Sequence, residues 1–138
     1  MGESPSAIGT RAEVEIAAAL TRAGKQVYLP LCASDGRVDS IFADESGLHR
    51  VQCKTSRLLG DVIAFSTCSN TGGVRKDYQG QADYLGVYSR DLDQVFLLPV
   101  DELPSRGCHL RLGPARNAQH KGLRWAGDYL IGRSSPKR

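Results

Sequence analysis

Residues 38–56, VDSIFADESGLHRVQCKTS, determine the fold prediction, because two β-rich runs flank a short stretch of turn-forming residues. The turn is expected within DESG at 44–47. If its two central residues form a two-residue turn, residues whose numbers sum to 91 pair, and Asp39 lies opposite Gln52. A shift by one residue pairs Asp39 with Cys53 instead, unless a bulge at the glycine absorbs the shift. The stretch therefore predicts a hairpin whose register is left open.

The second strand of this hairpin carries two polar side chains on one face. Gln52 and Lys54 are two residues apart, so they share a face, and Cys53 between them is expected to point into the packed face. Hydrolysis of a phosphodiester requires oxygen ligands for a hard divalent cation, a positive charge near the phosphorus and a source of hydroxide. Asp39, Gln52 and Lys54 can supply the first two. The alternative is that Lys54 ends a strand with a solvated ammonium group.

The segment SPSAIGTRAEVEIAAALTRAGKQ, residues 4–26, predicts a helix. Ser4 or Ser6 can cap it, Pro5 suits its first turn and Gly24 its end. Apolar residues recur at steps of three and four, which gives the helix one apolar stripe.

Two acids of this helix are expected on different faces. Glu13 is predicted on the inward stripe and Glu15 on the polar face, where it can pair with Arg11. A buried carboxylate requires a cation or hydrogen bonds. Glu13 therefore either reaches the same cation as Asp39, directly or through water, or it extends its carboxylate to solvent or pairs with an arginine.

The remaining sequence also predicts both strands and helical segments. Polar, glycine-containing residues 69–81 predict a loop, or a loop with a short helix. Residues 117–131 predict a closing helix with Trp125 and Tyr129 packed inward, and 108–114 predict an edge strand. A single α/β domain over residues 1–138 with a mixed central sheet is the simplest interpretation. Further strands are predicted at 25–31, 61–68, 82–89 and 94–100.

Composition restricts the function classes. The chain has 138 residues, 41% hydrophobic and 24% charged, with no apolar run of about 18 residues and no signal-like start, so a cytoplasmic protein without a membrane span is expected. The four cysteines form no CxxC pair and are expected to be free thiols. Residues 105–138 carry eight basic residues and one acid. This basic end suits either a polyanion partner or a solvated surface.

The pattern of these residues resembles the PD-(D/E)XK nuclease superfamily. Gly9-x3-Glu13 on an alanine-rich helix, Asp39 near a strand and Gln52-x-Lys54 are similar to the branch related to group I intron homing endonucleases, in which Gln replaces the usual acid. RVQCKTSR, QADYLGVYSRDLDQVFLLPVDEL and LRLGPARNAQHKGLRWAGDYL also resemble segments of that branch. The resemblance covers roughly residues 7–131 and leaves 132–138 as a basic tail.

The resemblance implies a restriction-endonuclease-like core, with a mixed central sheet of about four or five strands flanked by helices. It implies that Asp39 is the central ligand of Mg²⁺ or Mn²⁺, that Gln52 adds an amide oxygen, and that Glu13 and the Cys53 carbonyl complete the shell. Lys54 would activate the attacking water and stabilise charge on phosphorus. The neutral Gln52 should weaken metal affinity. No organic cofactor is expected.

The function expected is that of a metal-dependent DNA endonuclease that cuts by water attack. A Holliday-junction-resolvase-like nuclease and a catalytically weak DNA-binding module of the same fold are the alternatives. A homodimer or homotetramer is expected, because cutting both strands requires two sites. The candidate DNA contacts are Thr55, Ser56, Arg57, Arg75, Lys76, Arg116, Lys121 and Arg124. The presence of polar residues at these positions is explained equally well by exposure to solvent.

Overall fold

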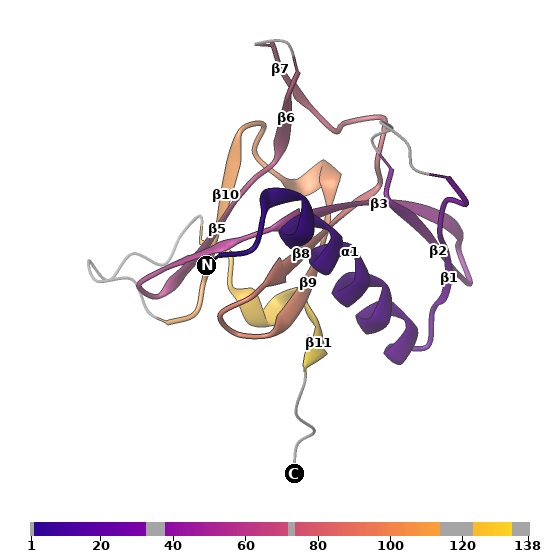
Figure 1. The fold of residues 1–138 in the computed structure, drawn as a ribbon, viewed down its shortest axis with the longest axis horizontal. Coiled ribbons are helices and arrows are strands. Elements are labelled where there is room, and N and C mark those ends of the chain that lie inside the picture. Colours follow the sequence, from indigo (N-terminus) through magenta and orange to yellow (C-terminus); the bar gives the residue numbers. More distant parts are fainter. Residues whose placement is uncertain (1, 33–37, 72–73, 114–122, 134–138) are drawn as a thin grey trace.

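The computed structural model describes residues 2–32, 38–71, 74–113 and 123–133. Its main element is a six-stranded sheet in the order β1-β2-β3-β8-β9-β11, crossed on one face by the helix α1 (Figure 1). The prediction of a mixed sheet is confirmed, and the sheet is wider than the four or five strands expected. The strands are β1 (Gln26–Tyr28), β2 (Ser40–Asp44), β3 (Gly47–Thr55), β8 (Tyr84–Ser89), β9 (Gln94–Pro99) and β11 (Leu130–Arg133).

The helix α1 (Pro5–Arg22) begins and ends as its sequence predicts. The Ser4 hydroxyl accepts a hydrogen bond from the Ala7 N–H at 3.1 Å, and Pro5 occupies the first turn. Gly24 follows the helix with φ +88°, a conformation that glycine adopts without strain. The apolar stripe packs against the sheet through Ala12, Ile16, Ala19 and Leu20, which meet Phe42, Val51, Tyr88 and Val95.

The hairpin of β2 and β3 has the register in which Asp39 can lie opposite Gln52. Its pairs run from Ser40 opposite Val51 to Asp44 opposite Gly47, so every pair sums to 91 and no bulge intervenes. The turn is closed by a hydrogen bond from the Ser46 N–H to Asp44 Oδ1 at 2.9 Å. Gly47 has φ +127°. The two-residue turn was therefore the correct alternative.

A second sheet covers the face opposite α1. It contains β4 (Arg57–Leu59), β5 (Val62–Ser66) and β10 (Gly107–Arg111) in the order β10-β5-β4. The expected edge strand is thus confirmed as β10. The residues between the two sheets form a second apolar cluster, so the core lies on both faces of the main sheet. Its largest members include Ile63, Phe65, Leu85, Val87, Phe96, Leu98 and Leu110.

Two predicted elements were wrong. Residues 69–81 were expected to be a loop, alone or with a short helix, but β6 (Cys68–Thr71) and β7 (Val74–Asp77) pair as a hairpin that projects from the body (Figure 1). In place of a closing helix the chain forms a short 3-10 turn (Ala126–Asp128) followed by β11; residues 117–122 lie outside the described part. Successive residues Leu130 and Ile131 pack into opposite clusters, which is the period of a strand.

Flanking elements also differ from the expectation of a sheet between helices. Within the described residues α1 is the one α-helix, and a further 3-10 turn spans Val100–Glu102. This helix does not combine the length and apolar composition that crossing a membrane requires.

Gly86 on β8 sets how closely α1 approaches the sheet. A Cβ atom at this position would meet Ile16 Cγ2 at 2.8 Å and Val51 Cγ1 at 3.3 Å. We expect Gly86→Ala to lower the free energy of unfolding by about 1–3 kcal/mol, because the helix must shift or a rotamer must strain. Denaturant unfolding measures this change.

The matched control is Gly9→Ala, at a helical position where an added Cβ meets nothing within 4 Å. It should raise the free energy of unfolding by about 0.5–1 kcal/mol. A Gly86→Ala variant as stable as the wild type would contradict the close packing.

Candidate active site

Asp39 is fixed where β2 begins and its pairing with β3 stops. Its N–H donates to the Val51 carbonyl at 2.8 Å, and its carboxylate Oδ2 accepts the Cys53 N–H at 2.8 Å. The carboxylate thus takes the position that a further residue of β2 would occupy in the ladder. Asp39 is thereby bound to Val51 and Cys53, the two residues that flank Gln52.

The two faces of β3 carry different chemistry. Val51 and Cys53 pack in the cluster beneath α1. Lys54 lies on the other face, where its Nζ donates to the Cys68 carbonyl at 3.3 Å and lies 4.9 Å from the centre of the Tyr78 ring. Gln52 shares this face by strand alternation. Cys53 therefore points into the packed face, as predicted.

Gln52 presents an amide oxygen that is buried and has no hydrogen-bond partner among the described residues. Burying such an acceptor without a donor costs about 1–3 kcal/mol, so an uncompensated oxygen at this position requires an explanation. An oxygen-binding cation would satisfy it. The sequence did not indicate that the Gln52 oxygen would be buried without a hydrogen-bond partner.

Glu13 was predicted on the inward stripe of α1. This prediction was wrong, because Glu13 is exposed. Ala12 and Ile16 occupy the buried line, and Glu13 flanks it. The error arose because a position beside the stripe satisfies several of the same three- and four-residue steps. The predicted pairing of Glu15 is confirmed, because Arg11 Nε lies 3.4 Å from Glu15 Oε2, but Glu15 is half-buried and less exposed than Glu13.

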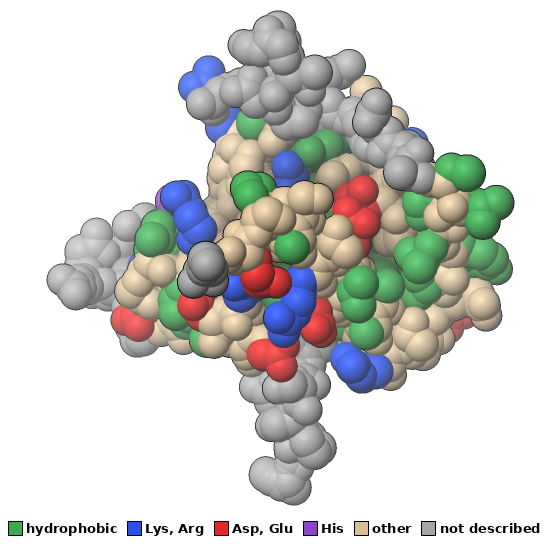
Figure 2. Space-filling model, in the orientation of Figure 1, with side chains coloured by type: hydrophobic (Ala, Val, Ile, Leu, Met, Phe, Trp, Pro, Cys, Tyr) green, Lys and Arg blue, Asp and Glu red, His purple; other side chains and the backbone are tan. Residues whose placement is uncertain are grey.

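Glu13 nevertheless shares an open pocket of about 270 Å³ with Asp39. The exposed Leu29 and Leu31 also line it, and Figure 2 shows hydrophobic side chains gathered around β1 on this side of the molecule. Partial burial, followed by the negative charge of Asp39, raises the pKa of Glu13. The two carboxyl groups therefore lie near enough to repel each other.

Asp39 also interacts with Lys54. Burial raises the pKa of Asp39, opposed by the Cys53 N–H bond and then by the positive charge of Lys54. The pKa of the Cys53 thiol is raised by burial and by the negative charges of Asp39 and Glu13. Negative charge thus contributes, after burial, to the raised pKa values of Glu13 and Cys53, and a cation would relieve that contribution.

The oxygen donors suit a hard cation, although their charge is small. Within the described ranges no group of three or more His, Cys, Asp or Glu side chains could hold a metal ion. The available donors are the Glu13 and Asp39 carboxylates and the Gln52 amide oxygen. The Cys53 carbonyl points to the same strand edge as the Cys53 N–H, and so toward Asp39. Oxygen-only donors of this kind match Mg²⁺ and Mn²⁺.

The predicted DNA contacts lie in different environments. Arg57 is exposed at the start of β4, and Thr55 ends β3 half-buried. Ser56 is buried and its hydroxyl donates to the Tyr88 carbonyl at 3.1 Å, which argues against a phosphate contact. Arg124 Nη2 donates to the Glu102 carbonyl at 2.9 Å. Arg75 and Lys76 belong to β7, while Arg116 and Lys121 lie outside the described residues.

Sequence reasoning missed the residues that hold Lys54. Cys68 ends the strand predicted at 61–68, and Tyr78 lies within the segment 69–81 that was not predicted to form strands. No local pattern connects either residue with β3. Only the tertiary contacts of β6 and of the residue after β7 with β3 bring them together.

The raised pKa of Asp39 predicts a pH-dependent effect of Asp39→Asn. The wild type binds the proton more tightly when folded, so its stability falls as pH rises from the ordinary Asp pKa through the raised one. The variant keeps an oxygen for the Cys53 N–H but has no charge. We expect its Tm to match the wild type near about pH 3 and to exceed it increasingly toward neutral pH.

Asp44→Asn is the control of opposite sign. Hydrogen bonds from Ser46 and His49 lower the pKa of Asp44, so its charge stabilises the fold above the ordinary Asp pKa. This variant should melt below the wild type at neutral pH. Thermal unfolding across pH measures both, and an Asp39→Asn difference that shrinks as pH rises would refute the assignment.

Comparison with known proteins agrees with this architecture. The family model described as PD-(D/E)XK endonuclease matches residues 4–131. Among solved structures, the bacterial homing endonuclease I-Ssp6803I is similar with a TM-score of 0.71 and 22% sequence identity, over 93% of this chain and 89% of that chain. None of the curated proteins matches. Because the family match spans nearly all of the sequence, the chain belongs to the PD-(D/E)XK endonuclease family.

Proposed function

We propose that this protein is a metal-dependent DNA endonuclease that hydrolyses phosphodiester bonds by water attack. The observation that supports this most strongly is the position of Asp39. A backbone hydrogen bond from Cys53 holds its carboxylate opposite Gln52, and the carboxylate interacts with both Glu13 and Lys54. Acidic ligands beside a fixed lysine are what charge neutralisation at phosphorus requires.

The proposed cation ligands are Asp39, Gln52 and Glu13, with the Cys53 carbonyl as a further oxygen. The buried, unpartnered Gln52 oxygen and the repulsion between the two carboxyl groups support this set. Mg²⁺ or Mn²⁺ held there would supply Lewis-acid stabilisation of the phosphoryl oxygens and acidify water. Glu13 lies on the helix side of the sheet and Gln52 on the other, so they can share an ion only at the open edge beyond the start of β2.

Lys54 is proposed to stabilise the negative charge that builds on phosphorus and to orient the attacking water. Its ammonium group carries three donors, and one of them is bonded to the Cys68 carbonyl. The Tyr78 ring on the same side fixes the group further. A lysine held in this way needs little reorganisation during the reaction.

Gln52 also supports a second candidate function. A neutral amide leaves two formal negative charges in the proposed ligand set, so cation affinity is lower than with three acids. A DNA-binding module of the same fold with a weak or inactive site is therefore the alternative. It predicts DNA binding that is independent of divalent ions and accompanied by no cleavage.

We also propose a homodimer or homotetramer, because each chain offers one candidate site and a duplex has two strands to cut. Paired sites on one assembly convert supercoiled plasmid directly to the linear form. A single site leaves nicked circles first. The plasmid assay described next reports on this distinction.

Lys54→Ala is the most direct test of the proposed chemistry. We expect it to lower the rate of DNA cleavage with Mg²⁺ or Mn²⁺ by at least about 100-fold, because a fixed positive charge at the transition state is lost. DNA binding should be largely kept. The assay follows cleavage of supercoiled plasmid, linear duplex and four-way junctions, and a preference for junctions would identify a resolvase.

The control is Lys25→Ala, which removes a lysine beyond the end of α1 and should leave cleavage unchanged. If the wild type cuts none of these substrates, or if Lys54→Ala cuts at the wild-type rate, the proposal is wrong.

A further inference from the structure

The outer face of the second sheet forms a groove unrelated to the predicted site residues, apart from Arg57. Arg57 on β4 and His109 on β10 both pair with Ala64 on the central strand β5, so the three share one face. Two residues further along β5, Ser66 pairs with Gly107 on the same face. Small residues therefore form the floor, and longer side chains stand at the sides.

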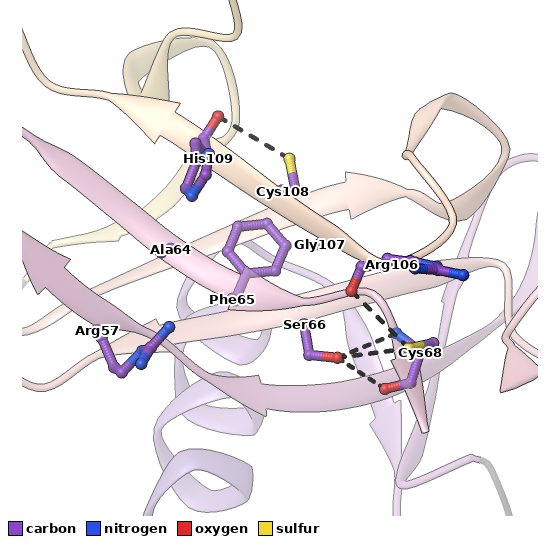
Figure 3. A pocket seen from close by; sticks show the side chains of 9 residues that line it. All are labelled: Arg57, Ala64, Phe65, Ser66, Cys68, Arg106, Gly107, Cys108 and His109. Carbon is purple, nitrogen blue, oxygen red and sulfur yellow. Dashed lines mark hydrogen bonds between the residues drawn. The ribbon is translucent and has the colours of Figure 1, made fainter. Parts of the chain in front are cut away.

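Figure 3 shows this arrangement at close range. Arg57, His109 and Arg106 lie around Ala64, Phe65 and Gly107. The open groove has a volume of about 480 Å³. Residues from all three strands of the sheet line it.

The groove has an unneutralised positive charge. Its lining contains Arg57 and Arg106 and no acidic residue. Within the described part of the chain, ion pairs are formed by Arg11, His49, Arg50 and Arg90, and the side chains of Arg57 and Arg106 take part in no ion pair or hydrogen bond. Exposed guanidinium groups free of carboxylates are available to an anion.

The groove shares a residue with the surroundings of Lys54. Cys68 lies at its end, and the Cys68 carbonyl accepts hydrogen bonds from Lys54 Nζ at 3.3 Å and from the Ser66 hydroxyl at 2.8 Å. Arg57 also follows Lys54 by three residues along the chain. The groove therefore ends at the residue that binds the lysine.

We propose that this groove binds the phosphate backbone of DNA, with Arg57 and Arg106 as its charged contacts and the His109 ring as an additional donor. The inference rests on the proposed function and extends it to Arg106 and His109, which were not among the DNA contacts predicted from the sequence. Arginine forks bind phosphate oxygens in pairs. The small floor residues Ala64 and Gly107 allow a backbone to approach closely.

The test compares the double variant Arg57→Ala/Arg106→Ala with the wild type. Fluorescence anisotropy measures the Kd for a labelled DNA duplex at several salt concentrations without divalent ions, so no cleavage is needed. We expect the Kd to rise at least about 10-fold near physiological salt, and the slope of log K against log[salt] to become shallower by about 1.8, because two phosphate contacts are lost.

The control variant Arg22→Ala/Lys25→Ala removes two charges at the end of α1, which covers the opposite face of the main sheet. It should leave both the Kd and the salt slope near the wild-type values. A double variant that retains arginine-like charge, Arg57→Lys/Arg106→Lys, should restore most of the slope and guards against a folding defect. Equal Kd values and slopes for the groove and control variants overturn the inference.

Cleavage separates this inference from the proposed function. Under the conditions of the plasmid assay, the groove variant should raise KM and leave kcat nearly unchanged, whereas Lys54→Ala lowers kcat. If the wild type cuts DNA and the groove variant behaves as the control, only the groove inference fails. If DNA binding falls as expected and no substrate is cut, the groove stands and the proposed function fails. A wild type that binds no DNA overturns both.

Discussion

The hydrogen bond from the Cys53 N–H to the Asp39 carboxylate is the interaction on which the candidate site depends. It terminates the β2–β3 ladder with a side chain instead of a further residue and so fixes an acid at the start of β2. The bond uses an N–H that would otherwise lack its ladder partner. One interaction thus satisfies the backbone and positions the acid, and the proposed roles of Glu13, Gln52 and Lys54 follow from where Asp39 is held.

The main sheet divides the remaining chemistry between its two faces. Glu13 approaches from the helix side, while Lys54 and its partners Cys68 and Tyr78 lie between the two sheets. Cys68 on β6 and Tyr78 after β7 hold the lysine, while the second sheet covers the core and presents a basic groove on its outer face. Metal ligation at one edge and phosphate contacts on a neighbouring surface are then properties of one arrangement of strands.

The hairpin register and the shared face of Gln52 and Lys54 could be predicted from the sequence because both depend on short-range rules. A two-residue turn sets the pairing, and side chains alternate along a strand. Glu13 was misplaced because the boundary of a helical stripe is broad. β11 and the partners of Lys54 could not be predicted, since their conformation depends on distant strands that provide pairing and packing. Of the site residues predicted from the sequence, those whose positions depend on local backbone geometry were predicted most reliably.

The central claim is that Asp39 and Gln52 hold one divalent cation at this edge, with Glu13 completing the shell. Anomalous diffraction from crystals soaked in Mn²⁺ tests it most directly. We predict a peak about 2 Å from an Asp39 carboxylate oxygen and from Gln52 Oε1, with a Glu13 oxygen bound directly or through water. No peak beside Asp39, or a peak there with the Gln52 oxygen still buried and unligated, would contradict the account.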